Sequence, residues 1–212
     1  MSDHPDHAPL RIAASFGALN VSVSRLLARQ RAAEPETPVS LVETGLAEQI
    51  EGLENGRYDL GFSMGQAAVP SVSAWPLCRE EIAVALPTRF PLLALGEIPL
   101  RELSRYPVVA WSNVECEPLS GQVDDLLNAA GVPLERVERV KSFGLMASLV
   151  AAGYGIALGT VSQIAAYRDQ GIVMRPLARP RHYLTTYLLG SETSRLASAE
   201  RFIARAGTSR PH

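Results

Sequence analysis

Three hydroxyl side chains stand where apolar runs end and helical patterns begin. Ser15 closes the run LRIAAS, Thr44 follows VSLVE, and Ser142 precedes the apolar pattern of residues 143–152. Helix N-termini present unpaired N–H groups with a partial positive charge, and open parallel sheets bind ligands at the carboxyl ends of their strands. Each hydroxyl taken alone also suits an ordinary N-cap. Together the three predict a cradle for a small anion, most simply a carboxylate.

The elements that must position these side chains alternate along the chain. Short apolar runs alternate with helical patterns, which is typical of βαβ units around a mostly parallel sheet. The predicted strands are 10–15, 39–43, 58–62, 81–86, 107–111, 137–141, 155–159 and 184–189. The predicted helices are 18–33, one between Thr44 and Gly56, 120–130, 143–152, 161–169 and 195–206. The sequence therefore predicts an α/β fold.

Two proline-rich stretches break this alternation and divide the chain into lobes. Residues 86–107 carry four prolines, and residues 175–183 carry two more. Each break indicates a crossing between lobes, so we expect lobe I over 8–86 plus 181–212 and lobe II over 87–180. Two crossings make a hinge, and the cleft between the lobes is the expected ligand site.

Composition and charge exclude several kinds of partner. The 212 residues are 47% apolar and 20% charged, with a mean hydropathy of +0.06 and a formal net charge of −2. These values predict a globular protein without the positive electrostatic field that attracts nucleic acid. No segment of the sequence is long and apolar enough to span a bilayer. Cys78 and Cys116 have no C-x-x-C partner and no histidine nearby, which indicates reduced thiols and no metal site. Residues 1–9 resemble a disordered lead-in rather than a signal peptide, which favours the cytoplasm.

Catalytic motifs are absent from the sequence. There is no G-x-S-x-G, H-E-x-x-H, Walker loop or G-x-G-x-x-G, and Gly153-Tyr154-Gly155 precedes a strand rather than a helix. His182 is the one histidine outside the tails, and it has no serine or cysteine partner at a fixed spacing. The sequence therefore predicts neither an enzyme nor a bound cofactor.

Three segments resemble the effector-binding domain of LysR-type transcriptional regulators. QIEGLENGRYDLGF (49–62) resembles that family's L-x-x-G-x-x-D-hydrophobic-G segment. EEIAVALPTRFPLL (80–93) is similar to its strand-and-hinge motif, and SLVAAGYGIALGT (148–160) to its helix-turn-strand motif. With the strand at 10–15, the resemblance extends from Leu10 to Ala206.

The resemblance implies a type 2 periplasmic-binding-protein-like fold of two Rossmann-like lobes with an effector in the cleft. It also implies a homodimer, assembled to a tetramer in the full-length protein, with the exposed faces of helices 18–33 and 120–130 as candidate contacts. Two departures fall on packing and turn positions. Phe90 stands where the family usually has histidine, and Gly159-Thr160 replaces a hydrophobic-Pro pair at the end of a strand.

The family's DNA-binding part is expected to precede Leu10. A winged helix-turn-helix and a linker helix should stand there, yet only nine residues do. We therefore expect a truncated effector domain that contacts DNA only through a missing N-terminal domain and does not contact a membrane. A natural regulator without a DNA-binding arm stays an alternative.

The family's ligand contacts, carried over by motif, fall at the ends of strands and the starts of helices. They are Ser15, Phe16, Gly17, Thr44, Phe62, Ser63, Trp111, Ser112, Asn113, Ser142 and Phe143. A small planar or alicyclic acid suits this set, with its carboxylate on Ser15, Thr44 or Asn113. Phe62 also suits the core, and no arginine clamp for a dicarboxylate is evident. Glu115 and Glu117 leave an amine ligand open.

Two other kinds of protein remain as alternatives. A solute-binding protein of a transport system has the same two-lobe fold, and a pure interaction module would respond to no ligand. The sequence upstream of Leu10 would separate regulator from solute receptor, since the first has a helix-turn-helix there and the second a signal peptide. Effector identity, target genes and the direction of regulation are not encoded in any motif.

Overall fold

The structure, a computed structural model, divides the chain into two compact units. It describes residues 8–67, 69–133, 136–193 and 196–207. Unit 1 comprises Met1–Cys78 with Thr186–His212, and unit 2 comprises Arg79–Thr185. Most of the lead-in expected over residues 1–9 lies outside the described residues. In the described ranges no helix combines the length and the hydropathy needed to cross a membrane.

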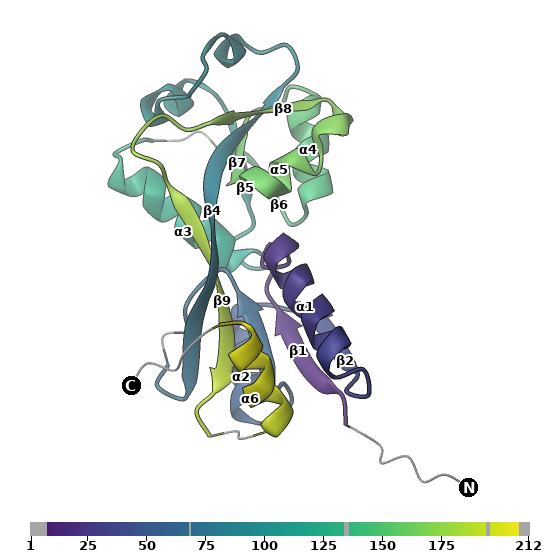
Figure 1. The fold of residues 1–212 in the computed structure, drawn as a ribbon. Coiled ribbons are helices and arrows are strands. Elements are labelled where there is room, and N and C mark those ends of the chain that lie inside the picture. Colours follow the sequence, from purple (N-terminus) through teal and green to yellow (C-terminus); the bar gives the residue numbers. More distant parts are fainter. Residues whose placement is uncertain (1–7, 68, 134–135, 194–195, 208–212) are drawn as a thin grey trace, which may run out of the picture. The chain divides into compact units, whose positions relative to one another are not determined.

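The sheet of unit 1 has the strand order β2-β1-β3-β9-β4 (Figure 1). Its strands are β1 (Leu10–Ala14), β2 (Val39–Glu43), β3 (Leu60–Ser63), β9 (Tyr183–Ser191) and β4 (Val72–Pro87). β1 pairs in parallel with β2 and β3, whereas β3 pairs antiparallel with β9. The sheet is therefore mixed, which corrects the mostly parallel sheet expected from the sequence.

Helices cover both faces of this sheet. They are α1 (Val21–Ala33), α2 (Leu46–Glu54) and α6 (Ala197–Arg205). Leu53 of α2 packs against Ala13, whereas the ring of Phe202 in α6 lies 6.2 Å from that of Phe62. Ala14 pairs with Phe62, and neighbouring residues of a strand point to opposite faces, so α2 and α6 cover opposite faces. Full burial of a side chain such as Phe202 contributes about 2 to 3 kcal/mol.

Helix α1 begins three residues later than the predicted helix 18–33, because Asn20 caps it. The Asn20 Oδ1 accepts from the N–H groups of Ser22 at 2.9 Å and Val23 at 3.2 Å. Its Nδ2 donates to Cys78 Sγ at 3.3 Å and to Thr186 Oγ1 at 3.1 Å. Asn20 therefore joins the start of α1 to β4 and β9 at the residues where those strands leave unit 1.

Unit 2 is built around the second half of β4. This half pairs antiparallel with β7 (Ala157–Thr160) and β8 (Ile172–Pro176), while β5 (Val108–Trp111) pairs in parallel with β6 (Arg136–Val140). The helices are α3 (Glu117–Ala129), α4 (Phe143–Ala151), α5 (Val161–Ala165) and the 3-10 helices Pro91–Ala94, Leu100–Arg105 and Arg168–Gln170. A bridge between Val108 and Ile156 connects β5 to the segment before β7.

The largest differences from the predicted elements concern β4, β8 and the division into units. β4 begins at Val72, well before the predicted strand 81–86. The earlier part of β4 was not predicted because Pro76 lies in it and proline usually interrupts a strand. β8 overlaps the stretch that the sequence analysis took as a crossing between lobes. The units divide after Cys78 and Thr185 rather than after residues 86 and 180, because β4 and β9 run through both divisions.

The two departures from the family pattern both have local partners. Thr160 caps α5, since its Oγ1 accepts from the Gln163 N–H at 3.4 Å and its own N–H donates to Gln163 Oε1 at 3.2 Å. This reciprocal arrangement satisfies two N–H groups at the start of the helix. The ring of Phe90 lies 4.8 Å from that of Tyr106. The structure thus gives each departure a structural role.

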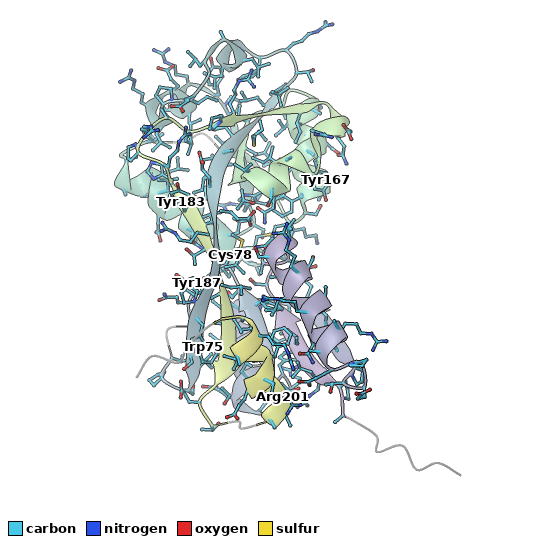
Figure 2. All side chains as sticks on the ribbon, viewed as in Figure 1. Trp75, Cys78, Tyr167, Tyr183, Tyr187 and Arg201 are labelled. Atoms are coloured by element: carbon cyan, nitrogen blue, oxygen red, sulfur yellow. The ribbon has the colours of Figure 1, made fainter. Side chains whose placement is uncertain are left out.

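A charged cluster fastens α1 to α6. Glu34, directly after α1, accepts from Arg201 Nε at 2.6 Å, from Arg201 Nη2 at 3.0 Å and from Arg205. Its side chain is only 12% exposed, and Figure 2 labels Arg201 on α6. The hydrogen bonds from Arg201, and then those from Arg205, hold the pKa of Glu34 well below its usual value.

We expect Glu34→Gln to lower the free energy of unfolding at neutral pH by about 1 to 2 kcal/mol, because both guanidinium groups lose a charged acceptor. Since the folded-state pKa is lowered, this stability is present above the unfolded pKa of about 4.3 and is lost as the pH falls below it. Urea unfolding between neutral pH and about pH 3 should show the difference from wild type shrinking. Glu36→Gln, at an exposed neighbour, should change stability by no more than about 0.5 kcal/mol. A difference that stays constant down to acid pH would contradict this account.

Candidate functional site

Ser15 lies directly after β1, where the chain turns away from the sheet. Its side chain is fully buried. Its N–H donates to the Phe62 carbonyl at 2.8 Å, and its Oγ accepts from the Met64 N–H at 3.3 Å. The following turn uses Gly17, whose φ of 80° suits glycine. Asn20 caps α1, so the prediction that Ser15 caps a helix is wrong, and Ser15 belongs to a network at the strand ends.

The other residues predicted for this end of unit 1 differ in exposure. Phe62 is fully buried against Phe202, whereas Phe16 is half-buried. Ser63 is also fully buried, and its Oγ accepts from the Gly65 N–H at 3.0 Å. Phe62 and Ser63 thus have partners within unit 1, and their contact with a ligand stays a prediction.

Gln49 of α2 is a polar group at the same strand ends that the sequence analysis did not identify as a site residue. Its side chain is fully buried. In the amide orientation that satisfies both of its ends, Oε1 accepts from the Ser15 N–H at 2.6 Å and Nε2 donates to the Phe62 carbonyl at 3.3 Å. A Cβ on Gly61 would meet this amide at 2.8 Å, so glycine makes room for it. Gln49 therefore fixes the distance between the ends of β1 and β3.

Thr44 follows β2 without capping the next helix. The cap of α2 is Gly45, which offers no side-chain hydrogen bond, so the predicted N-cap role of Thr44 is wrong. The Thr44 N–H donates to the Ala14 carbonyl at 2.9 Å, and its Oγ1 donates to the Glu48 carboxylate. This hydroxyl is the first cause of the lowered pKa of Glu48. A ligand carboxylate at Thr44 would have to displace Glu48.

The aromatic residues predicted for unit 2 form a contiguous group of rings. Trp111 is only 2% exposed, and its Nε1 donates to the Leu158 carbonyl at 2.7 Å. Its ring lies 4.7 Å from that of Phe143, which in turn lies 6.3 Å from the ring of Tyr167, labelled in Figure 2. Phe143 is half-buried and therefore keeps part of its surface accessible. Trp111 supports the core, and contact of either ring with a ligand stays a prediction.

Polar groups after β5 bond to one another and to one arginine. Ser112 Oγ donates to the Glu115 carboxylate, and Asn113 Oδ1 accepts from Ser120 Oγ at 3.1 Å. Asn113 Oδ1 also accepts from Arg139 Nη1, which donates in addition to the last carbonyl of β5 at 3.0 Å. Arg139 was not among the predicted site residues, because its neighbours in sequence give no sign that it reaches β5.

Ser142 is the predicted hydroxyl whose helix-capping role is confirmed. It is the N-cap of α4, and its Oγ accepts from the Leu145 N–H at 3.2 Å. The Ser112 N–H donates to the Val140 carbonyl at 2.9 Å, so β5 and β6 end side by side. The predicted polar residues of unit 2 therefore gather at one edge.

Two titratable residues were considered in the sequence for other chemistry, Glu115 as a partner for an amine ligand and His182 as a catalytic group. The pKa of Glu115 is lowered, first by the Ser112 hydroxyl and then by its own N–H and by Lys141. The main-chain carbonyl of His182 accepts a hydrogen bond from the Ile82 N–H at 2.9 Å. Among the residues that the structure describes, no group of three His, Cys, Asp or Glu side chains is placed to hold a metal ion.

Comparison with known sequences gives one family. A family model described as the LysR substrate binding domain matches residues 4–209. The probable cat1 operon transcriptional activator of Acinetobacter lwoffii is 28% identical over 144 residues, which are 68% of this chain and 46% of that protein. The chain therefore spans about half the length of the curated relatives that it matches.

Solved structures give the same fold. The effector binding domain of QuiR in complex with shikimate has a TM-score of 0.83 at 19% identity, over 94% of this chain and 95% of that one. The BenM effector binding domain with its effector benzoate has a TM-score of 0.77 at 22% identity, over 96% and 95%. The expected type 2 periplasmic-binding-protein-like fold is confirmed, and the curated relatives are transcriptional regulators rather than enzymes. Because the family model covers nearly the whole chain, this protein belongs to the LysR substrate-binding domain family.

Proposed function

We propose that this chain senses a small carboxylic acid for a LysR-type transcriptional regulator and binds it at the strand ends that carry Ser15. The observation that carries the proposal is the hydrogen bonding of this serine. Its Oγ accepts from the Met64 N–H at 3.3 Å, and within the described residues its own proton has no acceptor. A hydroxyl held in this way is ready to donate, and a carboxylate is the strongest acceptor that a small ligand offers.

The ligands of the relatives support an acid. QuiR was solved with shikimate and BenM with benzoate. Each compound carries one carboxylate on a six-membered ring, which is the planar or alicyclic acid that the sequence predicts. Besides Ser15 we keep as proposed contacts Phe16, Gly17, Asn113, Ser142 and Phe143, which retain accessible surface. Thr44 and Ser112 are also half-buried, but their hydroxyls already donate to Glu48 and Glu115. No finding favours the solute-receptor alternative.

The proposed mechanism is a shift between two arrangements of the units. A ligand that binds one arrangement more tightly moves the equilibrium toward it by that difference in affinity. In the complete regulator the shift would reach DNA-binding arms outside this chain, in the cytoplasm.

We also propose a homodimer as the working form, with the exposed apolar side chains Val21 of α1 and Leu41 of β2 in the contact. Sedimentation velocity would detect this dimer and its loss in Val21→Arg.

A thermal-shift screen tests the proposed ligand class. The panel contains benzoate, shikimate, aliphatic monocarboxylic acids, amino acids and amines. An acid at about one hundred times its Kd should stabilise the chain by about 2.7 kcal/mol, which is visible as a rise in Tm. Ser15→Ala should weaken binding of that acid about tenfold, because one hydrogen bond to a charged group is lost.

The matched control is Ser24→Ala, at an exposed serine of α1. It should leave the Kd of the acid unchanged. A panel in which only amines raise the Tm would contradict the acid and favour the amine alternative. A hit that Ser15→Ala and Ser24→Ala affect equally would remove Ser15 from the site.

A further inference from the structure

We propose that Arg139 determines the preference of this sensor for acids by contacting the ligand carboxylate with its guanidinium group. The inference rests on the proposed function and adds to it a charged residue of unit 2. It also supplies an arginine for the carboxylate, where the sequence showed no arginine clamp for a dicarboxylate.

Arg139 is exposed on β6 and anchored through one terminal nitrogen. Nη1 donates to the Trp111 carbonyl at 3.0 Å and to Asn113 Oδ1. Across the described ranges neither Nε nor Nη2 has a protein acceptor. Because the guanidinium group is planar, anchoring Nη1 fixes the edge formed by Nε and Nη2. That edge is the one that binds a carboxylate through two parallel hydrogen bonds.

Neighbouring groups offer further donors at the same edge of unit 2. The Oδ1 of Asn113 already accepts from Ser120 and Arg139, so the Nδ2 group is what Asn113 has left to offer a ligand. Helix α4 starts at Phe143, shortly after β6, and its N-terminus adds a partial positive charge, although the N–H groups of Leu145 and Met146 already donate to Ser142. A ligand placed here would therefore meet donors rather than acceptors.

Two carboxylates lie in this stretch of chain, and each has a donor of its own. Ser112 Oγ donates to Glu115, and the main-chain N–H of Arg139 donates to Glu138 Oε1 at 3.0 Å. Neither carboxylate pairs with the Arg139 guanidinium group among the ion pairs of the described residues. Since the arginine is exposed, its contact should serve selectivity for an acid more than overall affinity.

The test measures affinity for acids and for their neutral counterparts. Isothermal titration calorimetry is run with benzoate against benzamide, shikimate against methyl shikimate, and any other acid of the panel against its methyl ester. In the wild-type chain the acid should bind at least about tenfold more tightly than its counterpart. Arg139→Gln should remove this preference and leave the neutral Kd unchanged, whereas Arg139→Lys should keep part of it.

Arg101→Gln is the matched control, since Arg101 is an arginine of the same unit with a side chain 85% exposed. Arg101→Gln should leave the Kd of the acid and the Kd of its neutral counterpart unchanged. If Arg139→Gln weakens acid and neutral compound equally, or weakens neither, the inference about Arg139 is overturned while the acid sensor stands. If no acid binds the wild-type chain, the proposed ligand class fails and the inference fails with it.

Discussion

Replacing Gly155 by alanine should lower the free energy of unfolding by about 3 kcal/mol, at the upper end of the usual cost of overpacking. Gly155 is buried in front of β7, and a Cβ there would lie 2.5 Å from the Pro107 carbonyl oxygen and 3.0 Å from its carbon. That oxygen cannot retreat freely, because it accepts from the Ile156 N–H at 2.9 Å. The Ile156 carbonyl in turn accepts from the Val109 N–H at 2.8 Å. The added methyl group would therefore separate β5 from the segment before β7.

Urea unfolding of Gly155→Ala beside Gly144→Ala measures this effect. Gly144 lies inside α4 in the same unit, and a Cβ there would meet nothing within 4 Å. Because alanine is the better helix former, Gly144→Ala should raise stability by about 0.5 to 1 kcal/mol. Equal stabilities of Gly155→Ala and wild type would show that the Pro107 backbone can shift at no cost.

Local signals in the sequence were sufficient for many of the elements. Ser142 marks the start of α4, and the structure confirms this cap. Gly56 and Gly153, predicted to follow helices, have φ values of 74° and 83°, a conformation that favours glycine. The period of apolar residues and the caps depend on neighbours in sequence, so they can be read without the fold. The strand 39–43 was predicted with the bounds that β2 has.

The parts that were missed depend on partners far along the chain. The first half of β4 was not predicted as a strand, because it contains Pro76. The strand accommodates this proline, whose side chain is exposed. Gln49 acts through Ser15 and Phe62, and Arg139 reaches Asn113, which is 26 residues away. No local pattern encodes such contacts.

A weak signal did exist for Gln49. Leu46, Gln49 and Leu53 recur at the spacing of one helix face, and a polar residue on an apolar face needs a buried partner. For the candidate site as a whole, the sequence indicated which strand ends gather polar groups. It did not indicate which hydroxyls would be committed to neighbours such as Glu48 and Glu115.

Trp111→Ala should be the most damaging change among the predicted contacts, lowering the free energy of unfolding by about 3 to 5 kcal/mol. The side chain is 2% exposed, so truncation leaves a cavity beside Phe143. Truncation also leaves the Leu158 carbonyl without its indole donor. Trp111→Phe keeps a ring and loses that hydrogen bond, so it should cost about 1 to 3 kcal/mol. Urea unfolding of both variants gives the two values.

The same variants separate a core residue from a ligand contact. If Trp111 acts only by holding the end of β5 in place, Trp111→Phe should lose stability while its Kd for an acid stays within about twofold of wild type. Tyr154→Ala, at a residue 64% exposed, is the control and should change stability by no more than about 0.5 kcal/mol. A Trp111→Phe chain as stable as wild type, with a Kd raised about tenfold, would instead place the indole against the ligand. Trp111 would then join Arg139 as a contact, because Arg139 donates to the Trp111 carbonyl and the two residues would approach the acid together.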